Sequence, residues 1–330
     1  MESGFLELKH YDVESLAGLL DIMRRPYQDA YYAMYSSLYE GVVTDPALML
    51  IPLDDHMVHR GDGIFDTFKC VNGKIYNMWN HLERMYRTAA TLEYKLSCTI
   101  GELGRIVVST VRMAGHRDCG IRILVSRGPG SFGANPADCA QGHFFVIVSR
   151  LGEPFMTKHA NGARAVSSRF VAKTQPLCRL KSCNYLENAL MKSEASTAGV
   201  DFVAAFDERG FLLEGATENF GVVTEDGRLM FPELDGILPG TTMLRVVELA
   251  SELERSGMLT GIGHGDISRE DIMRAREMII TGTTPNIISV VEFDGDMVGD
   301  GKVGAVYNRL SELLLDDIAC NDELHTLVFS

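Results

Sequence analysis

The sequence has no long apolar run. Apolar stretches such as FFVIV (144–148) and MII (278–280) are far shorter than the roughly 18 residues that a membrane-spanning helix requires. The N-terminal stretch places charged residues among the apolar ones, which is not the profile of a signal peptide. We therefore expect a cytoplasmic protein without a membrane segment.

Cysteine and histidine are present, but the spacings of the common disulfide and zinc motifs are missing. The seven cysteines form no CxxC pair, and the nine histidines form no HExxH motif. An odd, scattered set of cysteines in a long chain is typical of free thiols rather than of a disulfide framework. Because the ligand spacings of zinc sites are missing as well, we expect no metal.

Positive charge is scarce. Asp and Glu total 45 against 31 Lys and Arg, a formal net charge of -14, and no Lys/Arg cluster forms a stripe along which a phosphate backbone could lie. We therefore expect no nucleic-acid partner. The chain does have apolar content: 46% of its 330 residues are apolar, which is enough for a large core and two domains.

Apolar periodicity divides the chain into two domains. An N-terminal extension, residues 1–33, precedes a small α/β domain, residues 34–150. The segment LGEP, at the start of residues 151–157, breaks the pattern after a predicted strand and indicates a linker. Residues 158–330 form the larger domain, and the expected fold class is α/β (α+β).

Each domain shows both helix and strand patterns. The small domain has two expected helices, one with a capping pair at Asn80 and Glu83 and one that begins near Thr99. In the large domain, a helix is expected to end before Gly199, and a longer one carries Met243 on its apolar face. Strands are expected at 64–70, 74–78, 121–126, 143–148, 163–171, 202–206, 211–214, 220–224, 229–231 and 277–281.

A glycine motif of the dinucleotide-binding kind follows the strand at 121–126. Its glycines are Gly128, Gly130 and Gly133. A dinucleotide site needs a helix that opens at the third glycine and leads to the next strand. The interval 134–142 is too short for that helix and contains a proline, so the motif predicts a loop.

Two turns in the large domain could bind a phosphate group. In LPGTT (238–242), the chain enters the helix that carries Met243, and free backbone N–H groups and hydroxyls meet at the positive end of the helix dipole. In GTTP (282–285), a second hydroxyl pair follows a strand. An ordinary capped helix and a tight turn remain the alternative interpretations.

A cofactor held by one phosphate often uses a lysine to form a Schiff base. Lys181 is the best placed lysine because it directly precedes a predicted helix, where its amine could be held rigidly and partly desolvated. Desolvation lowers the pKa of a lysine and makes the neutral amine available as a nucleophile. On the residues alone, a solvated lysine remains the simpler interpretation.

Several motifs together resemble one enzyme family. They are, in chain order, GDGIFDT (61–67), HLER (81–84), RLKSCNYL (179–186), EGATENF (214–220), LPGTT (238–242) and TGT (281–283). Their order and spacing resemble the class IV, fold type IV aminotransferases, which use pyridoxal 5′-phosphate (PLP). Segments between residues 34 and 61 look most like the plant-type D-amino-acid transaminase branch, and branched-chain aminotransferases and aminodeoxychorismate lyases share the scaffold.

The resemblance implies a role for each matched residue. Lys181 would hold the cofactor as a Schiff base and shuttle the substrate proton, while Glu214 would pair with the pyridine nitrogen. Tyr185 would hydrogen-bond the ring oxygen, and Leu238 would pack on the ring. The residues expected around the phosphate are Arg84, Thr241, Thr242 and Thr283.

The resemblance also leaves the substrate open. Where bacterial D-amino-acid transaminases have a tyrosine and an R-x-H pair, this chain has Phe65 and no R-x-H. Arg122 or Arg127 would then bind the substrate carboxylate. The family implies a homodimer that acts on an amino acid and a 2-oxo acid. A D-amino acid such as D-alanine is the first expected substrate, a branched-chain L-amino acid the second, and aminodeoxychorismate the third.

Overall fold

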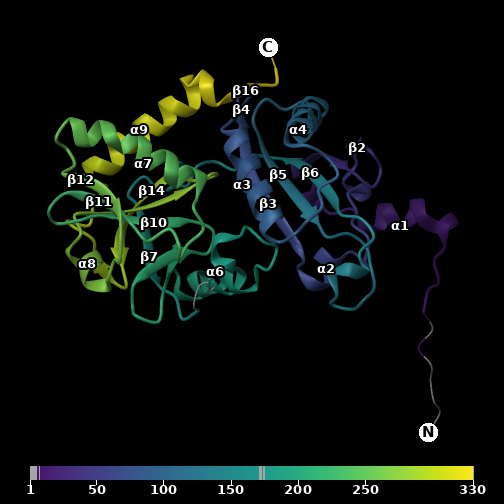
Figure 1. The fold of residues 1–330 in the computed structure, drawn as a ribbon, viewed down its shortest axis with the longest axis horizontal. Helices are drawn as coiled ribbons and strands as arrows, with labels where there is room; N and C mark the ends of the chain where they lie inside the picture. The colour runs from purple at the N-terminus through teal and green to yellow at the C-terminus, as the bar shows by residue number, and fades with distance from the viewer. Residues whose placement is uncertain (1–5, 7, 171–172, 174, 330) are drawn as a thin grey trace, which may run out of the picture.

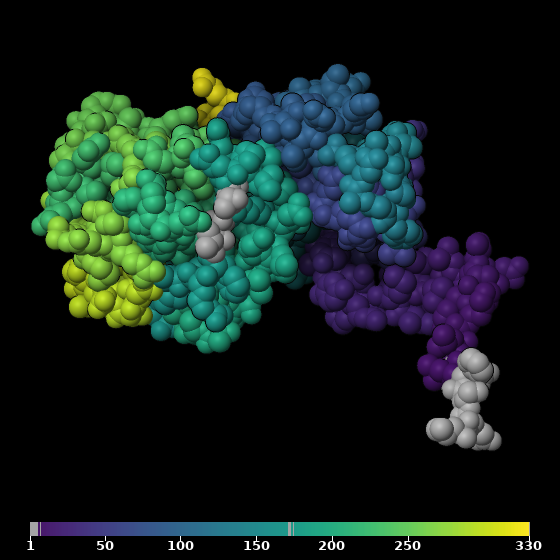
Figure 2. Space-filling view, turned by 60° about the horizontal axis from the view of Figure 1, so that its bottom comes forward, coloured from purple at the N-terminus to yellow at the C-terminus, as the bar shows by residue number. Residues whose placement is uncertain are grey.

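The structure is a computed structural model that describes residues 6, 8–170, 173 and 175–329. Two lobes, each built on its own β-sheet, lie side by side (Figure 1). The N-terminal segment with α1 (Leu16–Met23) projects away from the first lobe, as Figure 2 also shows, and α1 has no buried residue.

The first lobe is built on a seven-stranded antiparallel sheet. Its strands, in spatial order, are β16 (His325–Leu327), β4 (Lys74–Tyr76), β3 (Gly63–Val71), β5 (Cys119–Ser126), β6 (His143–Ser149), β1 (Tyr31–Ser36) and β2 (Gly41–Val43). Two helices, α3 (Met78–Thr91) and α4 (Ile100–Ala114), pack on this sheet. The short helix α2 (His56–Arg60) precedes β3.

Both predicted helices of this lobe form, but one cap differs. Thr99 caps α4 with the reciprocal Glu102 partner that its sequence favours. By contrast, α3 begins at Met78, so the predicted N-cap at Asn80 is wrong. The residue before the helix is Asn77, in the left-handed conformation at φ 56°, where it ends the tight β4–α3 connection. Asn80 and Glu83 lie inside the helix.

The second lobe is built on a nine-stranded mixed sheet. Its strands, in spatial order, are β12 (Gly261–His264), β11 (Arg228–Phe231), β10 (Asn219–Val223), β13 (Glu277–Gly282), β14 (Asn286–Phe293), β7 (Ala163–Ser167), β8 (Phe202–Phe206) and β9 (Leu212–Gly215), with β15 (Asp296–Met297) paired to β14. The helices of this lobe are α5 (Phe155–Lys158), α6 (Leu186–Ala198), α7 (Thr241–Arg255), α8 (Arg269–Arg274) and α9 (Ala305–Cys320).

The predicted strands of the second lobe are found, with small shifts at their ends. Strand β7 ends at Ser167, and Val171, the predicted end of that strand, lies outside the described residues. Helix α6 begins at Leu186 and ends at Gly199, whose left-handed conformation at φ 67° closes it as expected. The large strand β14 and the helix α9 were not predicted.

The chain crosses between the lobes more than once. Residues 151–157 connect β6 to the second lobe, while β16 brings the C-terminal end back to the first sheet. The linker and domain boundaries stay predictions. Buried polar contacts join the lobes: the Tyr76 hydroxyl of β4 donates to Asp317 of α9, and Lys69 of β3 donates to Asn286 of β14. These contacts fix how the lobes face each other.

Candidate active site

Lys181 lies where a connecting segment pairs with the first lobe. The Phe65 backbone N–H donates to the Lys181 carbonyl at 2.9 Å, and the Cys183 N–H donates to the Gly63 carbonyl at 2.8 Å. The segment therefore extends the start of β3 by a short antiparallel bridge, centred on Ile64 and Ser182. This pairing holds the Lys181 side chain at the junction of the lobes, with Nζ 4.8 Å from the centre of the Phe65 ring.

The surroundings of Lys181 favour its neutral form. Burial, together with the positive charge of Arg84, lowers the pKa of Lys181 to about 8. A larger share of the amine is therefore unprotonated near neutral pH than in a solvated lysine. Such an amine can act as a nucleophile and as a proton acceptor. The sequence-based expectation of a rigid, partly desolvated lysine matches this setting.

Glu214 lies near the end of β9, in contact with the turn that leads to α7. Burial raises the pKa of Glu214 to about 7, although the Leu238 backbone N–H donates to it at 3.1 Å. The Asn219 side-chain amide is a second, longer donor at 3.5 Å. Both donors reach Oε2, so Oε1 is available to accept a hydrogen bond from a ligand.

A buried charge cluster lies beneath Lys181, on the facing sides of β3 and α3. The Asp66 carboxylate accepts from Arg84 Nε at 3.0 Å and Nη2 at 2.8 Å, and lies 2.8 Å from His81 Nδ1. Burial opposes ionisation of this carboxyl, but the charges of Arg84 and His81 hold the pKa of Asp66 well below its usual range. Asp66 is therefore an anion, and Arg84 is locked by two hydrogen bonds to it.

The same cluster orients the start of α7. Burial lowers the pKa of His81, so the ring is neutral at neutral pH. With its Nδ1–H donating to Asp66, the other nitrogen, Nε2, accepts from the Thr241 hydroxyl at 3.1 Å. Arg84 Nη1 also donates to the Pro239 carbonyl at 3.2 Å. Helix α3 of one lobe thereby positions the first turn of α7 in the other.

Sequence reasoning assigned no role to Asp66 or His81, although the signal was present. Along β3, side chains alternate between the two faces, so Asp66 shares a face with Ile64 and Phe68. Those two residues are buried. His81 and Arg84, three positions apart on α3, share a helix face. A buried acidic residue on a strand requires a cationic partner, and Arg84 of the HLER motif is a candidate for that partner.

The turn before α7 is shaped for an anion. Gly240 is the N-cap residue of α7, and a Cβ atom at this position would lie 2.1 Å from Asn219 Oδ1, so a larger residue would displace the Asn219 side chain. The first backbone N–H groups of a 15-residue helix, that of Thr241 among them, and the hydroxyl of Thr242 are the expected donors. The Thr241 hydroxyl itself already donates to His81. Thr283, after β13, lines a small void together with Thr242.

A cavity of about 630 Å³ opens between the lobes above this cluster. The predicted site residues that line it are Phe65, Arg122, Lys181, Tyr185 and Thr283. Tyr185 packs edge-on against Phe65 at 5.1 Å between ring centres, and burial raises the pKa of its hydroxyl. The structure thus brings together residues from both lobes that are more than two hundred positions apart in the sequence.

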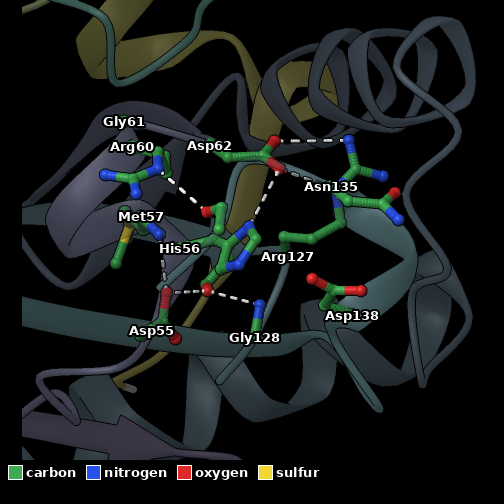
Figure 3. A network of polar contacts seen from close by, with 12 residues as sticks. Asp55, His56, Met57, Arg60, Gly61, Asp62, Arg127, Gly128, Asn135 and Asp138 are labelled. Carbon is green, nitrogen blue, oxygen red and sulfur yellow. Dashed lines mark hydrogen bonds and ion pairs between the residues drawn. The ribbon is translucent and has the colours of Figure 1, made fainter. Parts of the chain in front are cut away.

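The two candidate arginines for a substrate carboxylate differ in position. Arg122 is exposed to the cavity, with its guanidinium carbon 5.9 Å from the Phe65 ring centre. Arg127 donates to Asp62 at 3.0 and 3.2 Å (Figure 3). It also stacks on the Tyr94 ring, and it does not line the cavity. Because Arg127 already has a bidentate carboxylate partner, the structure favours Arg122.

The glycine motif lies in the loop that Figure 3 shows. Within residues 127–142, all of which the structure describes, the only helical element is the 3-10 turn Pro136–Asp138, so the predicted loop is confirmed. Ser126 anchors the loop by contacting Asp55 and accepting the Gly128 N–H at 2.8 Å. No helix opens at Gly133 to receive a pyrophosphate.

Among the residues that the structure describes, no helix is both long and apolar enough to cross a membrane. Nor do three or more His, Cys, Asp or Glu side chains gather there in a way that could hold a metal ion. All seven cysteines are free thiols.

Comparison with known proteins gives one consistent result. The family model described as amino-transferase class IV matches residues 63–293. The chloroplastic D-amino-acid transaminase of Arabidopsis thaliana is 36% identical over 289 residues, which cover 87% of this chain and 77% of that protein. A putative branched-chain-amino-acid aminotransferase of Methanocaldococcus jannaschii is 31% identical over 262 residues, covering 79% and 89%.

Solved structures have the same fold. The T.th. branched-chain amino acid aminotransferase complexed with N-(5′-phosphopyridoxyl)-L-glutamate superposes with a TM-score of 0.83 at 25% identity, over 91% of this chain and 99% of that one. The Escherichia coli branched-chain enzyme superposes with a TM-score of 0.81 at 23% identity, over 91% and 100%. The expected fold type IV architecture is confirmed.

Proposed function

Because the chain belongs to the class IV aminotransferases, we propose that it moves an amino group from a D-amino acid, D-alanine foremost, to a 2-oxo acid, with PLP as cofactor. The position of Lys181 is the main observation that supports the proposed catalytic mechanism. Its amine has a lowered pKa, lies between the lobes, and shares a cavity with Tyr185 and Thr283.

The residues present fit PLP. Class IV aminotransferases depend on this cofactor, and when bound it withdraws electrons from the substrate Cα through its pyridinium ring. We infer that Lys181 holds it covalently, that Glu214 Oε1 accepts from the ring nitrogen, and that Tyr185 donates to the ring oxygen. Leu238 packs on the ring. The phosphate is assigned to Arg84, Thr241, Thr242 and Thr283, at the anion-shaped turn before α7.

Different residues of the chain serve proton transfer, charge stabilisation and positioning. Lys181 Nζ takes the proton from the substrate Cα, and its lowered pKa suits an acceptor that must act near neutral pH. Burial raises the pKa of Glu214 to about 7, and a protonated ring nitrogen beside it would favour the ionised carboxylate. Asp66 and His81 hold Arg84 and Thr241 in place while Lys181 takes the proton from the substrate.

Two observations bear on the substrate. The relative from Arabidopsis thaliana, a D-amino-acid transaminase by name, supports the D-amino-acid assignment. The apolar Phe65 wall, beside Arg122, would also suit a branched L-amino acid whose carboxylate pairs with the arginine. A branched-chain L-amino-acid aminotransferase is therefore the second candidate, which the relative from Methanocaldococcus jannaschii supports. An aminodeoxychorismate lyase is third.

We also propose a homodimer and a cytoplasmic location. The first lobe carries exposed apolar side chains, among them Phe132 at 63% and Leu53 at 73% exposure, that a second copy could cover. The free cysteines fit a reducing compartment.

Replacing the lysine tests the catalytic proposal. In Lys181→Ala, the visible absorbance of the lysine-bound cofactor disappears and the amino-transfer rate falls by about a thousandfold or more, because both the covalent link and the proton acceptor are lost. Lys158→Ala is the control, since Lys158 is an exposed residue paired with Glu153. A Lys181→Ala variant that keeps its absorbance and its activity would show that the site is wrongly assigned.

Single-turnover reactions test the substrate. The PLP-loaded enzyme is mixed in turn with D-alanine, D-glutamate, L-leucine and aminodeoxychorismate, and formation of pyridoxamine phosphate is followed by absorbance. We expect fast conversion with a D-amino acid. Fast conversion with L-leucine and none with either D-amino acid supports the branched-chain assignment instead. Pyruvate released from aminodeoxychorismate, without pyridoxamine phosphate, supports the lyase.

Sedimentation tests the assembly. Velocity and equilibrium runs at concentrations used for assay are expected to give the mass of a dimer. A monomer that retains full activity contradicts the homodimer.

A further inference from the structure

Lys69 is a buried cation without a carboxylate partner. It lies on β3 with 6% of its surface exposed, and Nζ donates to the side-chain oxygen of Asn286. Among the residues that the structure describes, no carboxylate forms an ion pair with it. Burial lowers the pKa of Lys69 to about 8. An isolated buried ammonium is costly, and a neutral amide does not cancel its charge.

Asn286 is held in a conformation that serves this contact. It is the first residue of β14, directly after Pro285, with a left-handed backbone at φ 64°, and it is buried. Asparagine tolerates that conformation better than most residues. Its side-chain oxygen thus reaches across the lobe junction and fixes Lys69 Nζ beside the cofactor site.

The ammonium lies directly behind the phosphate-binding turn. A void of about 10 Å³, room for about one water molecule, is lined by Lys69 and Asn286 together with Thr242, Thr283 and His81. Thr242 and Thr283 are two of the residues to which the proposed function assigns the phosphate. A phosphate held by these threonines would have Lys69 within reach, in direct contact or through one water.

The charges around the phosphate are otherwise incomplete. A phosphate monoester carries about -1.5 to -2 at neutral pH. Arg84 supplies donors, but its own charge is matched by the ionised Asp66, and His81 is neutral. The N-terminus of α7 contributes only about +0.5. Lys69 supplies a cation that no carboxylate of the described residues neutralises, on the Thr242 and Thr283 side of the turn.

We propose that Lys69, fixed by Asn286, is the cation that balances the cofactor phosphate from behind Thr242 and Thr283. This inference rests on the proposed function, since it takes PLP as the cofactor. Under this proposal, Arg84 orients the phosphate through hydrogen bonds, and Lys69 neutralises part of its negative charge. Lys69 is a positioning residue for the phosphate and takes no part in the proton transfer at Lys181.

The test compares PLP with pyridoxal, which lacks the phosphate, on the full-length chain. In Lys69→Met, we expect the dissociation constant for PLP to rise about tenfold to a hundredfold, the range of a lost charge-assisted hydrogen bond. The constant for pyridoxal should stay within about twofold. Thermal stability of the cofactor-free variant should equal or exceed that of the parent, because a buried unpaired charge has been removed.

Two variants complete the design. Lys69→Gln keeps a polar side chain that can contact Asn286 but removes the charge, so the preference for PLP over pyridoxal should fall as in Lys69→Met; this variant decides the question if Lys69→Met does not fold. Lys192→Met is the control, because the charge of Lys192 is already matched by Glu218 at 2.7 Å. Its PLP-to-pyridoxal ratio should equal that of the parent.

The outcomes separate the two claims. An unchanged PLP-to-pyridoxal ratio in Lys69→Met, or an equal loss of affinity for both compounds, overturns the role of Lys69. A parent chain that binds neither compound at Lys181 overturns the proposed function itself.

Discussion

The ionised carboxylate of Asp66, buried between β3 and α3, is the interaction on which the site depends. It holds Arg84 through two hydrogen bonds and fixes the tautomer of His81, which in turn accepts from Thr241. One buried anion therefore sets the direction of an arginine in one lobe and of a helix N-terminus in the other. The cost of burying the carboxylate is offset by a bidentate cationic partner, without which the cluster would be strongly destabilising.

Because the site is assembled from two lobes, its geometry depends on contacts that fix the lobes together. Arg84 reaches the Pro239 carbonyl, and the Tyr76 hydroxyl reaches Asp317, which also accepts from Arg245 of α7 at 2.9 Å. The chain itself crosses the junction at Lys181, where the connecting segment pairs with β3. The amine, the anion-binding turn and the cavity are thus held in place by contacts from both lobes, as precise proton transfer requires.

Features of the fold and site could be predicted from the sequence where the residues that decide them are close together in the chain. Local patterns predicted α4 with its start near Thr99, the Gly199 end of α6, and the loop at Gly128, because the deciding contacts lie within a few residues. The predicted N-cap at Asn80 is wrong because the left-handed Asn77 ends the connection from β4, so that α3 already begins at Met78. Return of the C-terminal strand to the first sheet, and the pairing of Arg127 with Asp62, join residues that are distant in the sequence. No periodicity records such pairings. The matched motifs identified the residues expected around the cofactor, but only the fold shows that Asp66 orients them.

The central claim, that this arrangement directs PLP to one particular amine, is tested most directly by locating the covalent link. Three lysines lie near the lobe junction: Lys181, Lys173 and Lys69, and burial lowers the pKa of each. The PLP-loaded protein is reduced with borohydride, digested, and its peptides are sequenced by mass spectrometry. The account predicts a single reduced phosphopyridoxyl group, on Lys181. The same group on Lys173 or Lys69, or spread over several lysines, would contradict it.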